Sequence, residues 1–288
     1  MNELKGLGTA LITPFKADGS VDYEALARLL DTQLTGFVDY IVVLGTTGEA
    51  ATMTDKERAE VRSFVRSYVN GRLPLVLGLG GNCTAAVCEA LRNTDLSGFC
   101  AILSVCPYYN KPNQEGLYQH FCAIAEASPI PVILYNVPGR TGVNLLPETV
   151  MRIYNARPDK IAGIKEASGN VEQIKDLICR KSKVESQKQF LVISGDDGIA
   201  CELMEAGAAG LISVASNAFP EDFWHIVHDK GAALQAKYAD MIRLLFAEGN
   251  PVGIKAVLAQ KGIIENQLRL PLVPASEQLQ EQIRQSGL

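Results

Sequence analysis

The sequence predicts an α/β protein, a (β/α)8 TIM barrel followed by a C-terminal helical appendage. Short apolar runs alternate with amphipathic segments from Gly6 to about residue 230. The runs recur roughly every 25 to 35 residues, about the length of one strand–helix unit. Each run is apolar throughout, as expected for parallel strands buried on both faces. Eight such units in series favour a closed barrel over the alternative, an open doubly wound sheet.

The individual elements follow from the period of the apolar residues. In Tyr23–Thr35 the leucines fall on one face, as expected for a helix that covers a sheet. The other clear helices are Lys56–Val69, Thr84–Asp95, Glu115–Ala127 and Ile199–Ala206. The predicted strands are Gly8–Thr13, Tyr40–Leu44, Leu75–Leu79, Cys100–Ser104, Pro131–Leu134, Ile161–Lys165, Phe190–Ser194 and Gly210–Val214.

The strand pattern stops after about residue 231. Helical periods follow over Ala232–Ala247, Gly253–Lys261 and Glu277–Gln285. We therefore expect a barrel domain over residues 1–231 and a helical domain over 232–288. No chemistry is visible in the second domain from its sequence.

Composition excludes several classes of protein. The 288 residues carry 27 basic and 32 acidic side chains, a net charge of −5, so nucleic acid is not an expected partner. No apolar run approaches the roughly 18 residues of a membrane span, and the N-terminus carries no signal-peptide pattern. Seven cysteines without C-x-x-C spacing indicate reduced thiols. We expect a cytoplasmic protein.

Chemistry in a barrel of this kind belongs at the C-terminal ends of the strands. Hydroxyls, glycines and carboxamides gather at those positions, whereas the opposite ends carry ordinary connectors such as Asn70-Gly71-Arg72. Examples at the C-terminal ends are Gly45–Glu49, Pro107–Asn110 and Gly195–Asp197. This asymmetry predicts an enzyme.

Lys165 lies at the end of the predicted buried strand Ile161–Lys165. Because burial of an ammonium group is costly, we expect burial to favour the neutral amine, which is a nucleophile towards carbonyls. The alternative is a lysine whose long side chain simply reaches solvent.

Three further features are candidates for binding and proton transfer. The turn Gly45–Glu49, with the sequence GTTGE, can bring backbone N–H groups together around a carboxylate, and its two hydroxyls can pass protons. Tyr135 ends a strand and can act as a general acid or base. Arg140, on a loop stiffened by Pro138 and Gly139, presents a fork suited to a carboxylate. An ordinary turn and a solvated loop charge are the alternatives.

Two other patterns are incomplete as cofactor or metal sites. The glycine-rich stretch Leu77–Asn82 lacks a dinucleotide fingerprint, because Cys83 stands where the third glycine belongs. His225 and His228 are three residues apart on a predicted helix, but no third metal ligand is evident. We expect no metal and no nicotinamide cofactor.

With GTTGE, PYYN, YNVPGRTG, GIKEASGN and SGDD in this order, the chain resembles the dihydrodipicolinate synthase family. These are pyruvate-dependent class I aldolases, a group that also contains N-acetylneuraminate lyase. The resemblance covers essentially the whole chain. It implies that Lys165 forms a Schiff base with pyruvate and that Tyr135 donates and accepts protons. Thr46 and Tyr109 complete a proton relay, and Tyr109 comes from the neighbouring subunit of a tight dimer.

The resemblance also implies the substrates. Thr47 and the backbone near Ile212 hold pyruvate, with Gly195 a further substrate-binding candidate, and Arg140 takes the carboxylate of L-aspartate 4-semialdehyde. The product is 4-hydroxy-tetrahydrodipicolinate, at the first committed step of the diaminopimelate and lysine pathway. The implied enzyme is a lyase and a homotetramer, a dimer of tight dimers. It needs no cofactor, because the lysine–pyruvate imine is itself the electron sink.

Regulation is where the chain departs from part of that family. Asn82 and Tyr108 match the allosteric cleft in which lysine-inhibited members bind lysine. Ala86, however, stands where those members place a glutamate, and Asp55 and Arg58 stand where they commonly have histidines. We therefore expect weak inhibition by L-lysine or none.

Two other functions remain open. A lyase for N-acetylneuraminate or a 2-keto-3-deoxy sugar acid would share Lys165 and Tyr135, but such relatives generally lack an arginine at the position of Arg140. A catalytically silent barrel that senses a ligand is the alternative outside enzymes, and the presence of Lys165, Tyr135, Thr46 and Thr47 argues against it.

Overall fold

The strands form a closed parallel barrel. The computed structural model describes residues 2–182 and 190–287, and within them eight strands are hydrogen-bonded in the order of the sequence. This confirms the predicted fold class, and the open doubly wound sheet is wrong. The strands are β1 (Gly6–Ala10), β2 (Tyr40–Val43), β3 (Leu75–Gly78), β4 (Ala101–Val105), β5 (Val132–Asn136), β6 (Ile161–Glu166), β7 (Leu191–Ser194) and β8 (Gly210–Ser213).

The chain divides into two compact units. The first consists of Pro74–Ile212 with the N-terminal residues up to Lys5, and the second of Gly6–Leu73 with Ser213–Leu288. The predicted division at residue 231, between a barrel and a helical domain, stays a prediction.

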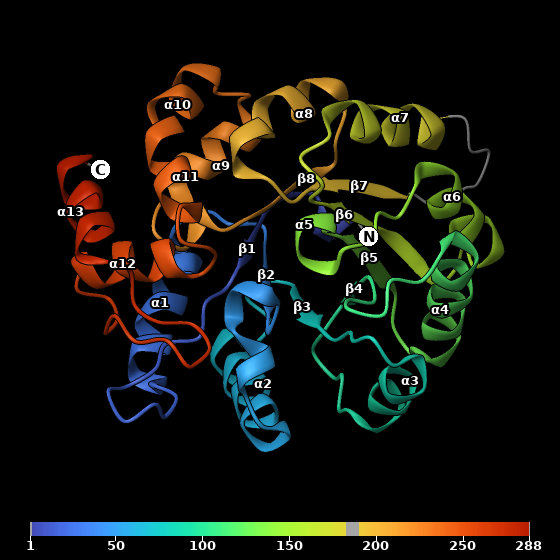
Figure 1. Ribbon diagram of the computed structural model, residues 1–288, viewed down its shortest axis with the longest axis horizontal. Helices are drawn as coiled ribbons and strands as arrows, with labels where there is room; N and C mark the ends of the chain where they lie inside the picture. Colours follow the sequence, from blue (N-terminus) through green and yellow to red (C-terminus); the bar gives the residue numbers. More distant parts are fainter. Residues whose placement is uncertain (1, 183–189, 288) are drawn as a thin grey trace. The chain divides into compact units, whose positions relative to one another are not determined.

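In the first unit, helices cover parallel strands (Figure 1). Successive helices α3, α4, α6, α7 and α8 pack side by side, and strands β4, β5, β6 and β7 pair in parallel. The helices are α3 (Thr84–Asn93), α4 (Gln114–Ala127), α5 (Pro138–Thr141), α6 (Pro147–Ala156), α7 (Val171–Ser182) and α8 (Ala200–Ala206). The strands are buried almost completely, which explains why their sequences are apolar rather than alternating.

The second unit joins the first two strands to the C-terminal helices. Its elements pack in sequence, with α1 on α2, α9 on β1 and each later helix on the next (Figure 1). The helices are α1 (Tyr23–Thr35), α2 (Asp55–Val69), α9 (Pro220–His228), α10 (Ala232–Lys237), α11 (Ala239–Phe246), α12 (Val252–Gln260) and α13 (Glu277–Gln285).

Local signals account for the helix starts. Asp22 caps α1 by accepting from the Ala25 N–H, and Thr54 and Glu57 form a reciprocal capping box at the start of α2. Asn113 caps α4 in the same way as Asp22 caps α1. Each cap satisfies N–H groups that have no partner inside the helix.

Most predicted boundaries differ from the observed ones by one or two residues, and two differences are larger. The first strand ends at Ala10 rather than Thr13, because Ile12 turns its N–H to the Asn217 side chain instead of the ladder. The predicted helix Ala232–Ala247 is two helices that meet at Tyr238. The Tyr238 ring packs on Phe219 and Phe223 and its hydroxyl donates to Asp222, so tertiary contacts at this residue accompany the break.

Among the described residues, no helix combines the length and apolar character required to cross a membrane.

Candidate active site

Lys165 and Tyr135 lie side by side on neighbouring strands. The register of β5 and β6 pairs Tyr135 with Lys165, and the Lys165 Nζ lies 4.5 Å from the centroid of the Tyr135 ring. Both residues are 6% exposed. The sequence predicted a buried lysine next to a tyrosine, and the structure brings the two together. A small electrophile that reaches the amine would also meet the phenol.

Gly195 lies under the lysine side chain. A Cβ built at Gly195 would lie 2.9 Å from the Lys165 Cε and 2.6 Å from the Ala167 Cβ. Any side chain at position 195 would therefore displace Lys165 or the strand end beside it. The close approach explains why position 195 holds a glycine.

Glu166, the residue after the lysine, is completely buried. Its carboxylate accepts from the Asn136 Nδ2 at 3.0 and 3.1 Å, from the Ser168 N–H at 2.8 Å and from the Gln173 Nε2 at 3.1 Å. Burial raises the pKa of the Glu166 carboxyl, and the hydrogen bonds from Asn136, Ser168 and Gln173 oppose that rise. Because neighbours on a strand point to opposite faces, Glu166 and Asn136 face away from Lys165 and Tyr135.

This buried network also holds the loop that carries Arg140. Asn136 accepts from the Leu145 N–H at 3.0 Å and donates to the Asn144 Oδ1 at 2.7 Å. Asn144 and Gln173 exchange side-chain hydrogen bonds of 2.8 and 3.1 Å. The loop is thus fixed at its C-terminal end, while Arg140 itself lies exposed on the short helix α5.

Tyr109 extends into solvent. Its side chain is 89% exposed and its φ angle is +74°, within a loop that leaves β4. The neighbouring residues tie this loop to Asn82: the Asn82 Nδ2 donates to the Tyr108 carbonyl at 3.2 Å, and the Asn110 Nδ2 donates to the Asn82 carbonyl at 2.9 Å. The predicted cleft residues Asn82 and Tyr108 are therefore in contact.

In the second unit, the GTTGE turn contains one short 3-10 helix, and a second, Ala50–Thr52, follows it. Thr46–Gly48 forms the first of them, and Glu49 follows in the left-handed region with a φ angle of +53°. Thr46 is exposed and Thr47 is buried. The Thr13 hydroxyl donates to the Gly48 carbonyl at 2.8 Å, and the Asn250 Nδ2 donates to the Thr47 Oγ1 at 2.9 Å.

Ile212 and the two histidines lie apart from the Lys165–Tyr135 pair in the sequence. Ile212 is buried within β8. His225 pairs with Asp229, and His228 pairs with Asp39 and stacks on Trp224. Among the described residues no group of three His, Cys, Asp or Glu side chains could hold a metal ion, and all seven cysteines are free thiols.

The model of the dihydrodipicolinate synthetase family matches residues 3–286. The chain belongs to this family. A 4-hydroxy-tetrahydrodipicolinate synthase from Parabacteroides distasonis is 51% identical over 290 residues, which cover 98% of this chain and 95% of that relative. Membership of the family makes the chain a lyase of the class I aldolase type.

Solved structures of dihydrodipicolinate synthases share the fold. The chloride-inhibited enzyme from Acinetobacter baumannii, complexed with pyruvate, is 40% identical with a TM-score of 0.92, and 98% and 97% of the two chains are covered. A monomeric dihydrodipicolinate synthase variant is 41% identical with a TM-score of 0.93, over 99% and 96% of the two chains. The family works without a metal or organic cofactor, through the imine of a lysine with pyruvate.

Sequence reasoning missed the polar partners of this dihydrodipicolinate synthetase family site. Asn136 and Glu166 are each adjacent to a predicted catalytic residue, and a polar residue at a fully buried strand end is itself a signal. Asn250 offered no comparable signal, since it lies about 200 residues from Thr47 in the sequence.

Proposed function

We propose that the chain condenses pyruvate with L-aspartate 4-semialdehyde to 4-hydroxy-tetrahydrodipicolinate, with Lys165 as the covalent catalyst. One observation carries the proposal: a buried lysine amine lies 4.5 Å from the ring of a buried tyrosine, over a glycine that leaves room for it. Membership of the family and the pyruvate complex of a relative support the same assignment.

The first half of the reaction forms the imine. The lone pair of the Lys165 Nζ attacks C2 of pyruvate, and the carbonyl oxygen leaves as water after gaining two protons. Tyr135 is paired with Lys165 in the register of β5 and β6, and its hydroxyl is the proposed carrier of these protons. The resulting iminium accepts the electron pair that is left when a methyl proton departs, which gives an enamine.

The second half forms the new carbon–carbon bond. The enamine carbon attacks the aldehyde carbon of the second substrate, and the aldehyde oxygen takes a proton. The amine of that substrate then attacks C2, closes the ring and displaces the lysine. The amine of Lys165 is regenerated, so no oxidant or reductant is consumed.

Binding and proton relay are assigned to the other predicted residues. Thr47 and the backbone near Ile212 take pyruvate, and Arg140 takes the carboxylate of the second substrate in a charge-assisted pair. Thr46 and Tyr109 extend the proton relay from Tyr135. Tyr109 is exposed in the single chain, which supports its contribution to a neighbouring subunit.

For the assembly we propose a homotetramer built from tight dimers, acting in the cytoplasm. The exposed Tyr108 and Tyr109 support an interface at this loop, because aromatic residues are enriched at interfaces. The seven free thiols support a reducing compartment.

Trapping of the imine tests the proposed chemistry. Borohydride reduction in the presence of pyruvate is expected to add one pyruvate-derived group per chain, at Lys165. Lys165→Arg should abolish both label and activity, because a guanidinium stays protonated and cannot attack. The matched control is Lys160→Arg, just before the same strand, where Lys160 Nζ donates to the Ser128 carbonyl; it should label normally. Label at another lysine, or none, would contradict the assignment.

A further inference from the structure

The segment between α11 and α13 approaches the GTTGE turn and supplies it with polar partners. Lys255 on α12 and Glu49 at the end of the turn have side chains that are 0% and 1% exposed, with 2.5 Å between the Nζ and the carboxylate. The Lys255 Nζ also donates to the Gln267 carbonyl at 2.9 Å. A pair buried this deeply is not a general source of stability, because removing both charges from water offsets their attraction. It does require Glu49 to keep one position.

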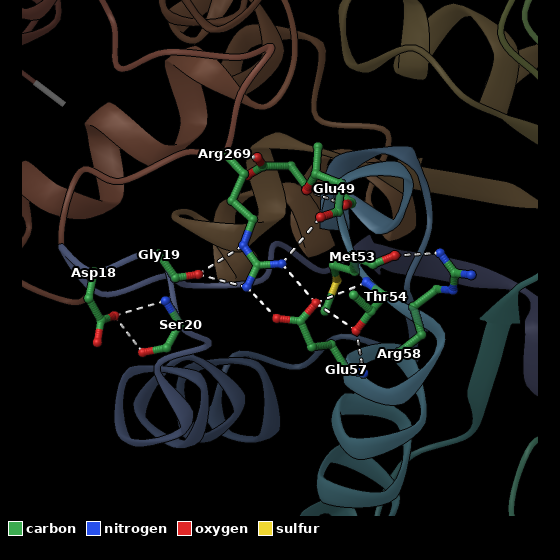
Figure 2. A network of polar contacts seen from close by, with 10 residues as sticks. Asp18, Gly19, Ser20, Glu49, Met53, Thr54, Glu57, Arg58 and Arg269 are labelled. Carbon is green, nitrogen blue, oxygen red and sulfur yellow. Dashed lines mark hydrogen bonds and ion pairs between the residues drawn. The ribbon is translucent and has the colours of Figure 1, made fainter.

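Arg269 contacts the end of the same turn and the residues that follow it (Figure 2). Its backbone N–H donates to the Glu49 Oε2 at 3.2 Å, and its guanidinium donates to the Thr52 carbonyl at 3.2 Å. The guanidinium also reaches the Gly19 carbonyl at 2.7 and 2.9 Å and the Glu57 carboxylate at 2.5 and 3.0 Å. Both ends of the segment Glu49–Thr52 are therefore attached to one arginine.

Asn250 acts on Thr47 itself. The Nδ2 of an asparagine can only donate, so in the 2.9 Å bond to Thr47 the hydroxyl oxygen is the acceptor. The hydrogen of the Thr47 hydroxyl must then point elsewhere, to another acceptor. Both residues are buried, so solvent competes little for this bond. The amide of Asn250 thereby orients the Thr47 hydroxyl so that it donates its hydrogen to another group.

We propose that Asn250 is a positioning residue for pyruvate: it orients the Thr47 hydroxyl to donate to the substrate carboxylate. The contacts of Glu49 with Lys255 and Arg269 keep the turn in place beside Asn250. This inference rests on the proposed role of Thr47 in pyruvate binding. It gives the C-terminal helical segment a part in substrate recognition, which its sequence did not indicate.

Asn250→Asp is the direct test, because it changes a donor into an acceptor at nearly constant volume. The carboxylate would draw the Thr47 hydrogen towards itself and add a negative charge near a bound carboxylate. We expect the KM for pyruvate to rise about tenfold or more, as loss of a hydrogen bond to a charged group implies, with kcat changed by less than about threefold. Gln260→Glu is the matched control: the same amide-to-acid change at the end of α12, where the side chain only donates to the Gln280 carbonyl. It should leave the KM unchanged.

A double-mutant cycle separates positioning from a structural effect. Thr47→Val removes the hydroxyl, and in that background Asn250→Asp should change the KM by less than about twofold, because residues that act as one unit are not additive. Thr47→Ser keeps the hydroxyl and should keep the sensitivity to Asn250→Asp. If Asn250→Asp does not fold, Asn250→Ala, which adds no charge, enters the same cycle.

The outcomes distinguish this inference from the proposed function. Borohydride labelling of Lys165 in the wild type, combined with a normal pyruvate KM in Asn250→Asp or with fully additive effects in the cycle, would overturn the role of Asn250 alone. Absence of the pyruvate label in the wild type would overturn the proposed function as well.

Discussion

At the scale of single residues, the site depends on the alternation of side chains along β5 and β6. Tyr135 and Lys165 point to one face of the strands, and Asn136 and Glu166 point to the other. The first pair is placed for the proposed covalent step, and the second pair receives and donates the hydrogen bonds that fix the strand ends. The Asn136, Ser168 and Gln173 groups that contact the Glu166 carboxylate are all N–H donors, so the pocket around it is built for an acceptor.

Arg140→Ala should separate the two substrates. The arginine is proposed to bind only L-aspartate 4-semialdehyde, and a hydrogen bond to a charged group contributes roughly 1.5 to 3 kcal/mol. We expect kcat/KM for the semialdehyde to fall roughly 10- to 150-fold, while imine formation with pyruvate stays near the wild-type rate. Steady-state kinetics and single-turnover borohydride trapping measure the two effects. A parallel loss of imine formation would contradict the assignment of Arg140.

His120 should make the protein sensitive to acid. This residue is buried on α4, its Nδ1 lies 2.8 Å from the Thr84 hydroxyl, and burial lowers its pKa from 6.5 to about 4. As the pH falls from about 6.5 to about 4, the unfolded chain therefore binds a proton at this histidine, whereas the folded chain does not. The contribution of His120 to the free energy of unfolding is fully present above pH 6.5 and falls across this interval by roughly 2 to 3 kcal/mol.

Urea unfolding at pH 7 and pH 4.5 measures that loss. Because His120→Gln has no imidazole to protonate, its free energy of unfolding should fall less between the two pH values than that of the wild type. His225→Gln, which changes a partly exposed histidine on α9, serves as the control and should follow the wild type. If the free energy of unfolding falls equally in the wild type and in His120→Gln, the imidazole is not the cause of the acid sensitivity.

At the scale of elements, loops are attached to the strand ends by side chains from distant helices. Gln114 at the start of α4 donates to the Asn144 carbonyl at 2.8 Å and accepts from the Leu146 N–H at 3.2 Å. Gln173 on α7 bridges Asn144 and Glu166. The loop that carries Arg140 is thus positioned by two helices and two strands of the same unit.

The start of α2 bears on regulation by L-lysine. Arg58 forms an ion pair with Asp55 and donates to the carbonyls of Ala50 and Met53 at 3.1 and 2.7 Å. The Asp55 carboxylate is thus engaged locally, and at the start of α3 Ala86 offers no carboxylate. A lysine ammonium would find no charge-assisted partner from these two residues.

We therefore expect initial rates to fall by less than about half with L-lysine at millimolar concentration, since an unpaired ammonium is penalised. Ala86→Glu should increase the sensitivity, whereas Ala85→Glu, at the neighbouring alanine, should not. Strong submillimolar inhibition of the wild type would mean that another acidic group takes the ammonium.

At the scale of the whole molecule, oligomeric state decides whether the proposed proton relay is complete. If the exposed ring of Tyr109 acts in a neighbouring subunit, an isolated chain lacks this member of the proton relay. One of the solved relatives is a monomeric dihydrodipicolinate synthase variant. The state of this protein is thus a functional question as well as a structural one.

Mixing of two inactive variants tests this point. Tyr109→Phe and Lys165→Ala chains, exchanged into mixed dimers, should recover activity, because one site of each mixed dimer would combine an intact lysine with an intact tyrosine. Random exchange gives about a quarter of the wild-type sites. If verified subunit exchange restores nothing, Tyr109 acts within its own barrel or outside the chemistry.

The sequence alone was sufficient for the fold class and for the pair at the centre of the site. Periods of 2 and 3.6 residues are local properties, so the strands and helices of a parallel barrel can be located from them. Equivalent positions at the ends of parallel strands must meet at one edge, and for this reason the sequence groups Tyr135, Lys165 and Gly195 together. Their roles came from the family motifs.

Only the tertiary structure decided which polar groups hold the threonine turn. Asn250 with Thr47, Lys255 with Glu49 and Arg269 with Glu57 are contacts between residues about 200 positions apart. No local period encodes such a contact, because it depends on how the C-terminal helices pack after the strands have formed. The C-terminal segment consequently shows no sign of function in its sequence, although its side chains hold the threonine turn.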